Sequence, residues 1–254
     1  INYLLLIHMK YLLLHIGQFF IMIKKVFSLP EKKSVFLKQF SLELEKTGLN
    51  SIGIVTIISF FIGAVVAIQT AYNFDSPLYP KYLIGYATRE SLILEFCPTM
   101  LALILAGKVG SNIASEIGSM RVTEQIDALE IMGINSASFL ILPKIIATVL
   151  FFPALIILSI CIGLLGGWIG GQTSGITTAD FLYGIKFEFN PFYVTYCLIK
   201  ITVFAFIVSS VSSYFGYYTK GGALDVGRSS TKAVVYSSII VLIFNFILTD
   251  LLLA

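Results

Sequence analysis

Five long apolar stretches are the feature that most limits what this chain can fold into. An α-helix needs about 20 apolar residues to cross the hydrocarbon core of a bilayer, and each stretch is near that length. They therefore predict an all-α membrane protein with about five transmembrane helices. Their approximate bounds are Ser51–Tyr72, Ser91–Ala106, Phe139–Gly167, Phe192–Tyr217 and Ala233–Leu253.

The composition agrees with a membrane protein. Of the 254 residues, 57% are hydrophobic and only 12% are charged, whereas soluble domains have about 25% charged residues. The three cysteines fall inside apolar stretches without CxxC spacing, and the histidines His8 and His15 alone cannot form a closed metal site. We therefore expect neither a disulfide nor a bound metal.

Two of the spans contain residues that disturb a helix. The second contains Glu95 and Pro98, so it is expected to extend toward Tyr86 and to be kinked. The third contains Pro143 and Pro153, which predict a tilt or kink, and its glycine-rich run at residues 163–171 is a candidate breaking point.

The distribution of Lys and Arg predicts the orientation. With the N-terminus in the cytoplasm, thirteen bases lie inside and three outside, and Lys200 lies within the fourth span. Such an excess follows the positive-inside rule and places the segment 106–136 in the cytoplasm and the C-terminus outside. Because topology explains the net charge of +3, no nucleic-acid partner is expected.

Residues 1–50 are expected to form a region of interfacial and elbow helices, separate from the membrane domain at 51–254. Tyr3–Ile23 is apolar but interrupted by polar residues; a helix in the membrane interface is preferred to a signal peptide or a sixth span. Glu31–Thr47 resembles an amphipathic elbow helix. The chain begins with Ile, so Met9 is one possible start.

The segment from Ala106 to Ser136 is polar and lies between two apolar stretches. From Ser111 to Gly133 it has four acids, one base and no proline. It predicts a helix, with Thr123 and Glu124 opening a well-formed stretch and Gly133 ending it. A structured helix in the loop of a membrane protein offers a surface to a partner.

This segment closely resembles the signature of the MlaE/YrbE permease family, the membrane subunits of ABC-type lipid transporters that work with MCE-domain proteins. The resemblance is carried by the Gly107–Gly110 turn, the run from Ala114 to Met120, the Thr123-Glu124-Gln125 triplet, Asp127-Ala128-Leu129 and Met132-Gly133. The family usually has Pro-Arg after the next linker, whereas this chain has Pro143-Lys144. The similarity covers roughly Ser51–Ala254.

The resemblance implies a non-catalytic permease that forms a dimer with a second copy and binds a separate cytoplasmic ABC ATPase. The chain has no GxxxxGK[ST] motif, so ATP would act only through that partner. The resemblance also implies phospholipid as substrate, an MCE-domain partner on the outer side and a bacterial inner membrane. The expected ATPase-coupling residues are Glu116, Gly118, Met120, Arg121, Thr123, Glu124, Gln125, Asp127 and Glu130.

Glu95 and Lys200 are the candidate buried charges within the predicted spans, where an ionisable group costs at least about 2.5 kcal/mol at mid-membrane. Lys200 is too deep for easy snorkelling, so a polar partner or aqueous cavity is expected. Glu95 is nearer the outer end and has headgroup contact as an alternative. A Ser–Lys nucleophilic pair is strongly disfavoured.

Spans one and five are expected to line an apolar lipid path at the dimer axis, because both are low in polarity and the resemblance supports this placement. The candidate residues are Ile54, Ile58, Phe61, Val65, Ile68, Val235, Ile239, Leu242 and Phe246. The competing hypothesis is an ATP-independent lipid-binding or scramblase-like protein. An intramembrane enzyme is disfavoured because the chain lacks a recognisable catalytic set.

Overall fold

The computed structural model describes residues 2–27, 33–74, 76 and 79–253, and this described part contains helices and no strand. Five of its helices are long and apolar enough to cross a membrane, which confirms the expected architecture. Their bounds are Phe36–Asn73, Tyr82–Val122, Ser136–Thr173, Phe192–Tyr217 and Ala223–Leu253. The protein is therefore a multi-pass α-helical membrane protein.

The first two spans are continuous helices that contain π-helical turns. The first span consists of α2 (Lys33–Leu44), η1 (Glu45–Leu49) and α3 (Asn50–Asn73). The second consists of α4 (Tyr82–Ser91), η2 (Leu92–Phe96), α5 (Cys97–Leu105), η3 (Ala106–Gly110) and α6 (Ser111–Val122). The η2 turn directly precedes Pro98, where the kink was expected, because proline cannot donate an N–H to the preceding turn.

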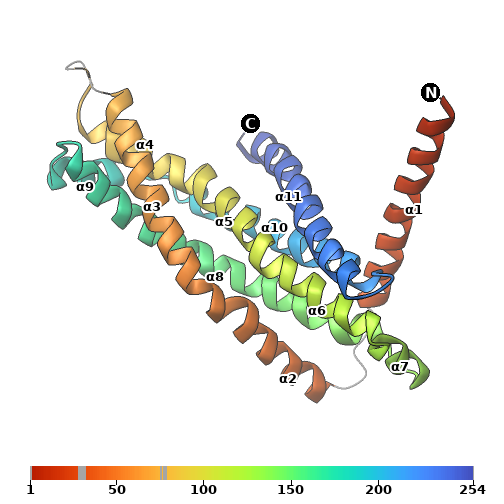
Figure 1. Ribbon diagram of the computed structural model, residues 1–254. Helices are drawn as coiled ribbons and strands as arrows, with labels where there is room; N and C mark the ends of the chain where they lie inside the picture. Colours follow the sequence, from red (N-terminus) through yellow and green to blue (C-terminus); the bar gives the residue numbers. More distant parts are fainter. Residues whose placement is uncertain (1, 28–32, 75, 77–78, 254) are drawn as a thin grey trace.

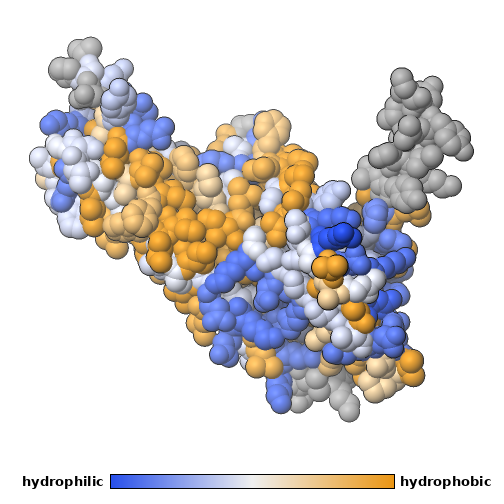
Figure 2. Space-filling view, viewed as in Figure 1, coloured by the Kyte–Doolittle hydropathy of each residue, from blue (hydrophilic) through white to orange (hydrophobic). Residues whose placement is uncertain are grey.

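The other spans are single helices, and two short helices lie beside them in the sequence. The spans are α8 (Ser136–Thr173), α10 (Phe192–Tyr217) and α11 (Ala223–Leu253), with α7 (Gln125–Ile131) before α8 and α9 (Thr178–Lys186) after it. Figure 1 places α7 and the start of α2 at one end of the bundle, and α4, α9 and the end of α11 at the other. Figure 2 shows an apolar band between these two more polar ends, as a bilayer requires.

Helix α1 (Asn2–Val26) stands apart from the bundle for most of its length (Figure 1). From His15 onward the helix contacts the bundle, since His15 Nδ1 lies 2.6 Å from the Tyr214 hydroxyl and Met22 and Val26 are fully buried. Among the described residues it is not one of the five candidate spans. Its location in the membrane interface stays a prediction.

The region expected to form an elbow is not separated from the first span by a loop. Helix α2 continues through η1 directly into α3. The domain boundary expected at residue 50 thus falls within a continuous helix, and the division into two domains stays a prediction. Within the expected elbow helix, the rings of Phe36 and Phe40 are stacked with their centres 6.2 Å apart. Glu31 and Lys32 lie outside the described residues.

The glycine-rich run at 163–171 does not break the third span, which corrects the expectation from the sequence: α8 is continuous from Ser136 to Thr173. Its glycines instead allow α3 to approach closely. A Cβ on Gly166 would lie 2.0 Å from the Phe60 carbonyl oxygen, and one on Gly170 would lie 2.5 Å from that of Ala64. From the α3 side, a Cβ on Gly63 would lie 1.8 Å from the Gly163 oxygen. Small residues at a crossing are typical of membrane helix pairs.

We expect Gly166→Ala to destabilise the protein by about 1–3 kcal/mol, because the added methyl group meets backbone that cannot move aside without separating α3 from α8. Gly163→Ala is the matched control one turn away, since its Cβ would find its nearest neighbour at an ordinary 3.5 Å. Thermal unfolding in detergent measures both. Equal effects of the two substitutions would show that close approach at Gly166 is not what stabilises the pair.

The orientation can be tested by cysteine labelling in a chain whose three native cysteines are replaced by alanine. A cysteine at Ser76 should react with an impermeant thiol reagent added to intact cells, and one at the exposed Thr123 should react only after the membrane is opened. Ser136 is a poorer probe because it is 2% exposed. The reverse labelling pattern would contradict the orientation.

Candidate functional site

The α6–α7 turn is formed by a left-handed residue. Glu124 has φ of 60° and its N–H donates to the Arg121 carbonyl, so the chain leaves the axis of α6 before α7 begins. Left-handed geometry costs a non-glycine residue roughly 1 kcal/mol or more. Helix α7 ends as expected at Gly133, whose φ is 78°. The N–H groups of Gly133 and Ile134 donate to the Glu130 and Leu129 carbonyls, which is a Schellman motif.

Three of the expected coupling residues attach α7 to the bundle. The Arg121 guanidinium donates to Asp127 Oδ1 at 2.7 Å and lies 5.8 Å from the centre of the Tyr217 ring. Glu130 Oε1 accepts hydrogen bonds from Ser136 and Tyr217, both at 2.9 Å. The Tyr217 and Ser136 hydroxyls favour the charged carboxylate and lower the pKa of Glu130.

The outward side of α7 exposes both polar and apolar side chains, and we call this surface the α7 face; its residues are given below. Ile131 and Met132 are 87% and 64% exposed. Glu124 has no side-chain partner among the described residues, unlike Asp127 and Glu130. The α7 face is formed by Thr123, Glu124, Gln125, Ala128, Ile131 and Met132. Of the expected acids on this helix, Asp127 and Glu130 thus bond to the rest of the bundle and Glu124 does not, and the exposed Ile131 and Met132 were not among the expected residues.

The other expected coupling residues face the bundle. Glu116 Oε2 accepts from Lys144 at 2.6 Å, and its Oε1 accepts from Lys46 at 3.0 Å. The same Lys144, 2% exposed, also donates to Glu43 at 2.7 Å. This four-residue ion network joins α2, η1, α6 and α8. Its members lie far apart in sequence, so no local pattern predicts the network.

Gly118 and Met120 also lie on inward-facing parts of α6. A Cβ on Gly118 would lie 3.2 Å from Thr219 Oγ1, so this glycine allows close packing. Met120 packs against the main core. Helix α6 therefore packs against the bundle along its length and leads to the α7 face at its end.

The two intramembrane charges form an ion pair with each other. The fully buried Lys200 lies with its Nζ 3.0 Å from Glu95 Oε2 and 3.0 Å from Thr249 Oγ1. The ammonium also lies 4.8 Å from the centre of the Tyr196 ring. The expected polar partner of Lys200 is therefore Glu95, whose side chain remains 46% exposed.

Pro98 contributes to this ion pair through an absent N–H. In an α-helix the N–H of residue 98 would donate to the Leu94 carbonyl, and proline has none. Lys200 Nζ donates to this carbonyl at 3.3 Å. On the other side, Glu95 Oε1 accepts hydrogen bonds from Thr99 and Asn245. Asn245 and Thr249 complete the site and were not predicted, although both are polar residues in an apolar span.

Arg89 was counted only as an outside base, but it is 1% exposed and organises the opposite end of the bundle. It pairs with Glu90 and donates to the Ile185 and Phe187 carbonyls at 2.6 and 2.9 Å. These bonds hold the end of α9 against α4. Aromatic rings of Tyr82, Tyr183 and Phe187 pack in the same place.

The expected lipid-path residues mainly point away from the bundle. On α3, Phe61 and Val65 are 62% and 58% exposed, and on α11, Phe246 is 75% exposed. Ile54, Ile68, Val235, Ile239 and Leu242 are also exposed, whereas Ile58 is partly buried beside Ser59, Cys97 and Ser159. Helix α3 packs chiefly on α8, and α11 on α10 and α6. Within the described chain the two rows thus belong to separate helix pairs.

No group of three His, Cys, Asp or Glu side chains that could bind a metal occurs in the described part of the chain.

We expect Glu95→Gln to destabilise the protein by about 1–2 kcal/mol, because Lys200 would remain buried without a counter-charge. This is less than for a fully buried pair, since Glu95 is half exposed. The double variant Glu95→Gln/Lys200→Met should recover most of the loss in thermal unfolding. Arg228→Gln, in an exposed pair, is the control. A double variant no more stable than Glu95→Gln would contradict the pairing.

The chain matches the protein family described as Permease MlaE over residues 40–251. A probable ABC transporter permease protein of Rickettsia prowazekii is 38% identical over 91% of this chain and 88% of that relative. The intermembrane phospholipid transport system permease protein MlaE of Haemophilus influenzae is 30% identical over 83% of this chain and 81% of its own length. The chloroplastic protein TRIGALACTOSYLDIACYLGLYCEROL 1 of Arabidopsis thaliana is 32% identical over 82% of this chain and 59% of its own. With its five spans and a match over most of its length, the chain belongs to the MlaE permease family.

Proposed function

We propose that this chain is the non-catalytic permease subunit of an ATP-driven phospholipid transporter in a bacterial inner membrane. In this proposal a separate cytoplasmic ABC ATPase binds the α7 face and an MCE-domain protein binds the outer end. Two copies of the chain form the transmembrane unit. The observation that carries the proposal is the exposed α7 face at the end of a helix that continues through the membrane.

The contacts of α6 support a coupling role. A partner that displaces α7 would move Arg121 and Glu130, which attach α7 to α6, α8 and α10. Through Glu116 the displacement would also reach Lys46 and Lys144 on the neighbouring helices. Packed helices that move as rigid bodies can transmit such a displacement across the membrane.

The relatives' names favour lipid over a polar solute, since one is named an intermembrane phospholipid transport permease. In our proposal, acyl chains contact the exposed rows on α3 and α11, from Ile54 to Ile68 and from Val235 to Phe246. These rows would face one another only across the two-copy axis. The half-exposed Glu95, paired with Lys200, would lie near the outer part of this path.

The proposed outer partner would contact the end formed by α4 and α9. Arg89 and the surrounding aromatic rings give this end a fixed shape. An ATP-independent scramblase-like function is the weaker candidate. Relatives named ABC transporter permeases and the exposed α7 face both favour a partner ATPase.

The docking proposal predicts that Glu124→Lys/Asp127→Lys, a double variant on and beside the α7 face, loses the co-expressed ABC ATPase. Replacing interface acids with bases should lower ATPase recovery by about tenfold or more, through lost charge-assisted contacts and new repulsion. Lipid transport should fall with it. The measurement is pull-down of the ATPase from membranes that contain equal amounts of permease.

Two further variants separate docking from folding. Glu124→Lys alone keeps the Arg121–Asp127 ion pair and should still weaken the complex. Glu45→Lys changes an exposed acid on η1, away from the α7 face, and should retain the ATPase. Full retention by both α7 variants would exclude these acids from the docking surface.

A further inference from the structure

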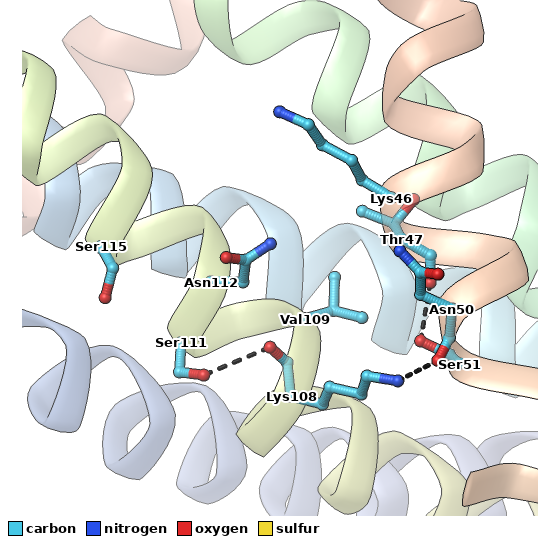
Figure 3. Close-up of a pocket in the computed structure, with 9 residues that line it drawn as sticks. All are labelled: Lys46, Thr47, Asn50, Ser51, Lys108, Val109, Ser111, Asn112 and Ser115. Atoms are coloured by element: carbon cyan, nitrogen blue, oxygen red, sulfur yellow. Dashed lines mark hydrogen bonds between the residues drawn. The ribbon is translucent and has the colours of Figure 1, made fainter. Parts of the chain in front are cut away.

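A polar cavity of about 460 Å³ lies between the first span and the second span, at the end of the bundle that includes α7. Two π-helical turns face one another across it, and each contributes one lysine: Lys46 from η1 and Lys108 from η3 (Figure 3). Single π-helical turns occur frequently at functional sites, because the widened turn re-aims side chains. Both lysines line the cavity, but their ammonium groups point apart: Lys46 Nζ lies 3.0 Å from Glu116 Oε1, and Lys108 Nζ donates to the Asn50 carbonyl (Figure 3).

The lining of the cavity favours an anion. It contains no acid and no aromatic ring, and its other polar side chains include Asn50, Ser111, Asn112 and Ser115. Among the described residues, the side-chain amides of Asn50 and Asn112 have no hydrogen-bond partner. Several N–H and O–H donors are therefore available to one ligand.

The charges around the cavity do not cancel. Lys46 belongs to the ion network of Glu43, Glu116 and Lys144, in which two bases meet two acids, so it adds no net charge. Lys108 donates to the Asn50 backbone carbonyl and has no acid within ion-pair distance in the described part of the chain. Its ammonium has further N–H groups to donate, so the cavity retains a positive charge that an anion would neutralise.

The cavity lies where the apolar part of the bundle begins. Lys108 follows the apolar helix α5, and Lys46 precedes the apolar part of α3. From Asn50, helical spacing leads along one face of α3 to Ile54, Ile57 and Phe61, which are 38%, 60% and 62% exposed. A charged group in the cavity could therefore be joined to acyl chains that lie along α3.

We propose that this cavity binds a phosphate group, held by Lys108 and Lys46 and by the amides of Asn50 and Asn112. Its source is a phospholipid headgroup in the leaflet nearest α7. Free inorganic phosphate has the same chemistry and is the competing source. The inference goes beyond the proposed transport function and needs only that this end of the bundle lies at the membrane surface.

The test is native mass spectrometry of the full-length protein in detergent, with phosphatidylglycerol or diacylglycerol of the same acyl chains. The protein should retain phosphatidylglycerol and not diacylglycerol. Lys46→Gln/Lys108→Gln should lower that retention by about tenfold, as expected when charge-assisted hydrogen bonds are lost. Lys220→Gln/Lys232→Gln, which removes two exposed lysines outside the cavity, should leave retention unchanged.

A second variant addresses the ion pair of Lys46. Asn112→Asp keeps both lysines and every ion pair, but it places a carboxylate at the exposed edge of the cavity, so it should also lower retention. Thermal unfolding and size-exclusion profiles establish that each variant is folded.

An excess of inorganic phosphate distinguishes the two sources. If phosphatidylglycerol remains bound, the headgroup is the ligand; if phosphate displaces it, the same site accepts free phosphate and the phosphate recognition stands. Undiminished retention of phosphatidylglycerol in both cavity variants, or equal retention of diacylglycerol, would overturn the proposal. Neither readout involves the ATPase, so failure of the docking experiment would not affect it.

Discussion

The contact between α3 and α8 is the constraint on which the rest of the structure depends. In lipid the hydrophobic effect does not drive helices together, so association relies on close packing and on hydrogen bonds. Gly63, Gly166 and Gly170 allow backbone to meet backbone along this contact. The small side chains Ser59 and Ser159 form a hydrogen bond of 2.7 Å within it. With α3 fixed on α8, the second span and α10 have a defined surface against which to pack.

The π-helical turns determine where the charged groups of the first two spans lie. Each of the three turns contains a charged residue with a specific contact: Lys46 in η1, Glu95 in η2 and Lys108 in η3. An inserted residue rotates the following part of the helix relative to a regular α-helix. This rotation brings Glu95 to Lys200 and places Lys46 and Lys108 on the lining of one cavity. Charges that would be costly in lipid are thereby directed toward protein partners.

Much of the fold could be predicted from the sequence because apolar length is a local property. The five spans, the disturbance before Pro98 and the end of α7 at Gly133 all follow from short windows. The glycine run of α8 was misinterpreted, since the same residues weaken an isolated helix and permit a close helix pair. The partnership of Glu95 with Lys200 was also missed, although both residues were identified. It depends on relative depth and on π-helical rotation, which no local pattern specifies.

The absent N–H of Pro98 bears on the order in which the second and fourth spans acquire the groups that join them. A regular residue at position 98 would supply an amide hydrogen to compete with the Lys200 ammonium for the Leu94 carbonyl. Proline has no N–H, so the Leu94 carbonyl accepts no α-helical hydrogen bond from residue 98. This acceptor is already present when α10 has yet to be synthesised. The second span thus enters the membrane with a binding position for a cation that arrives more than a hundred residues later in the chain.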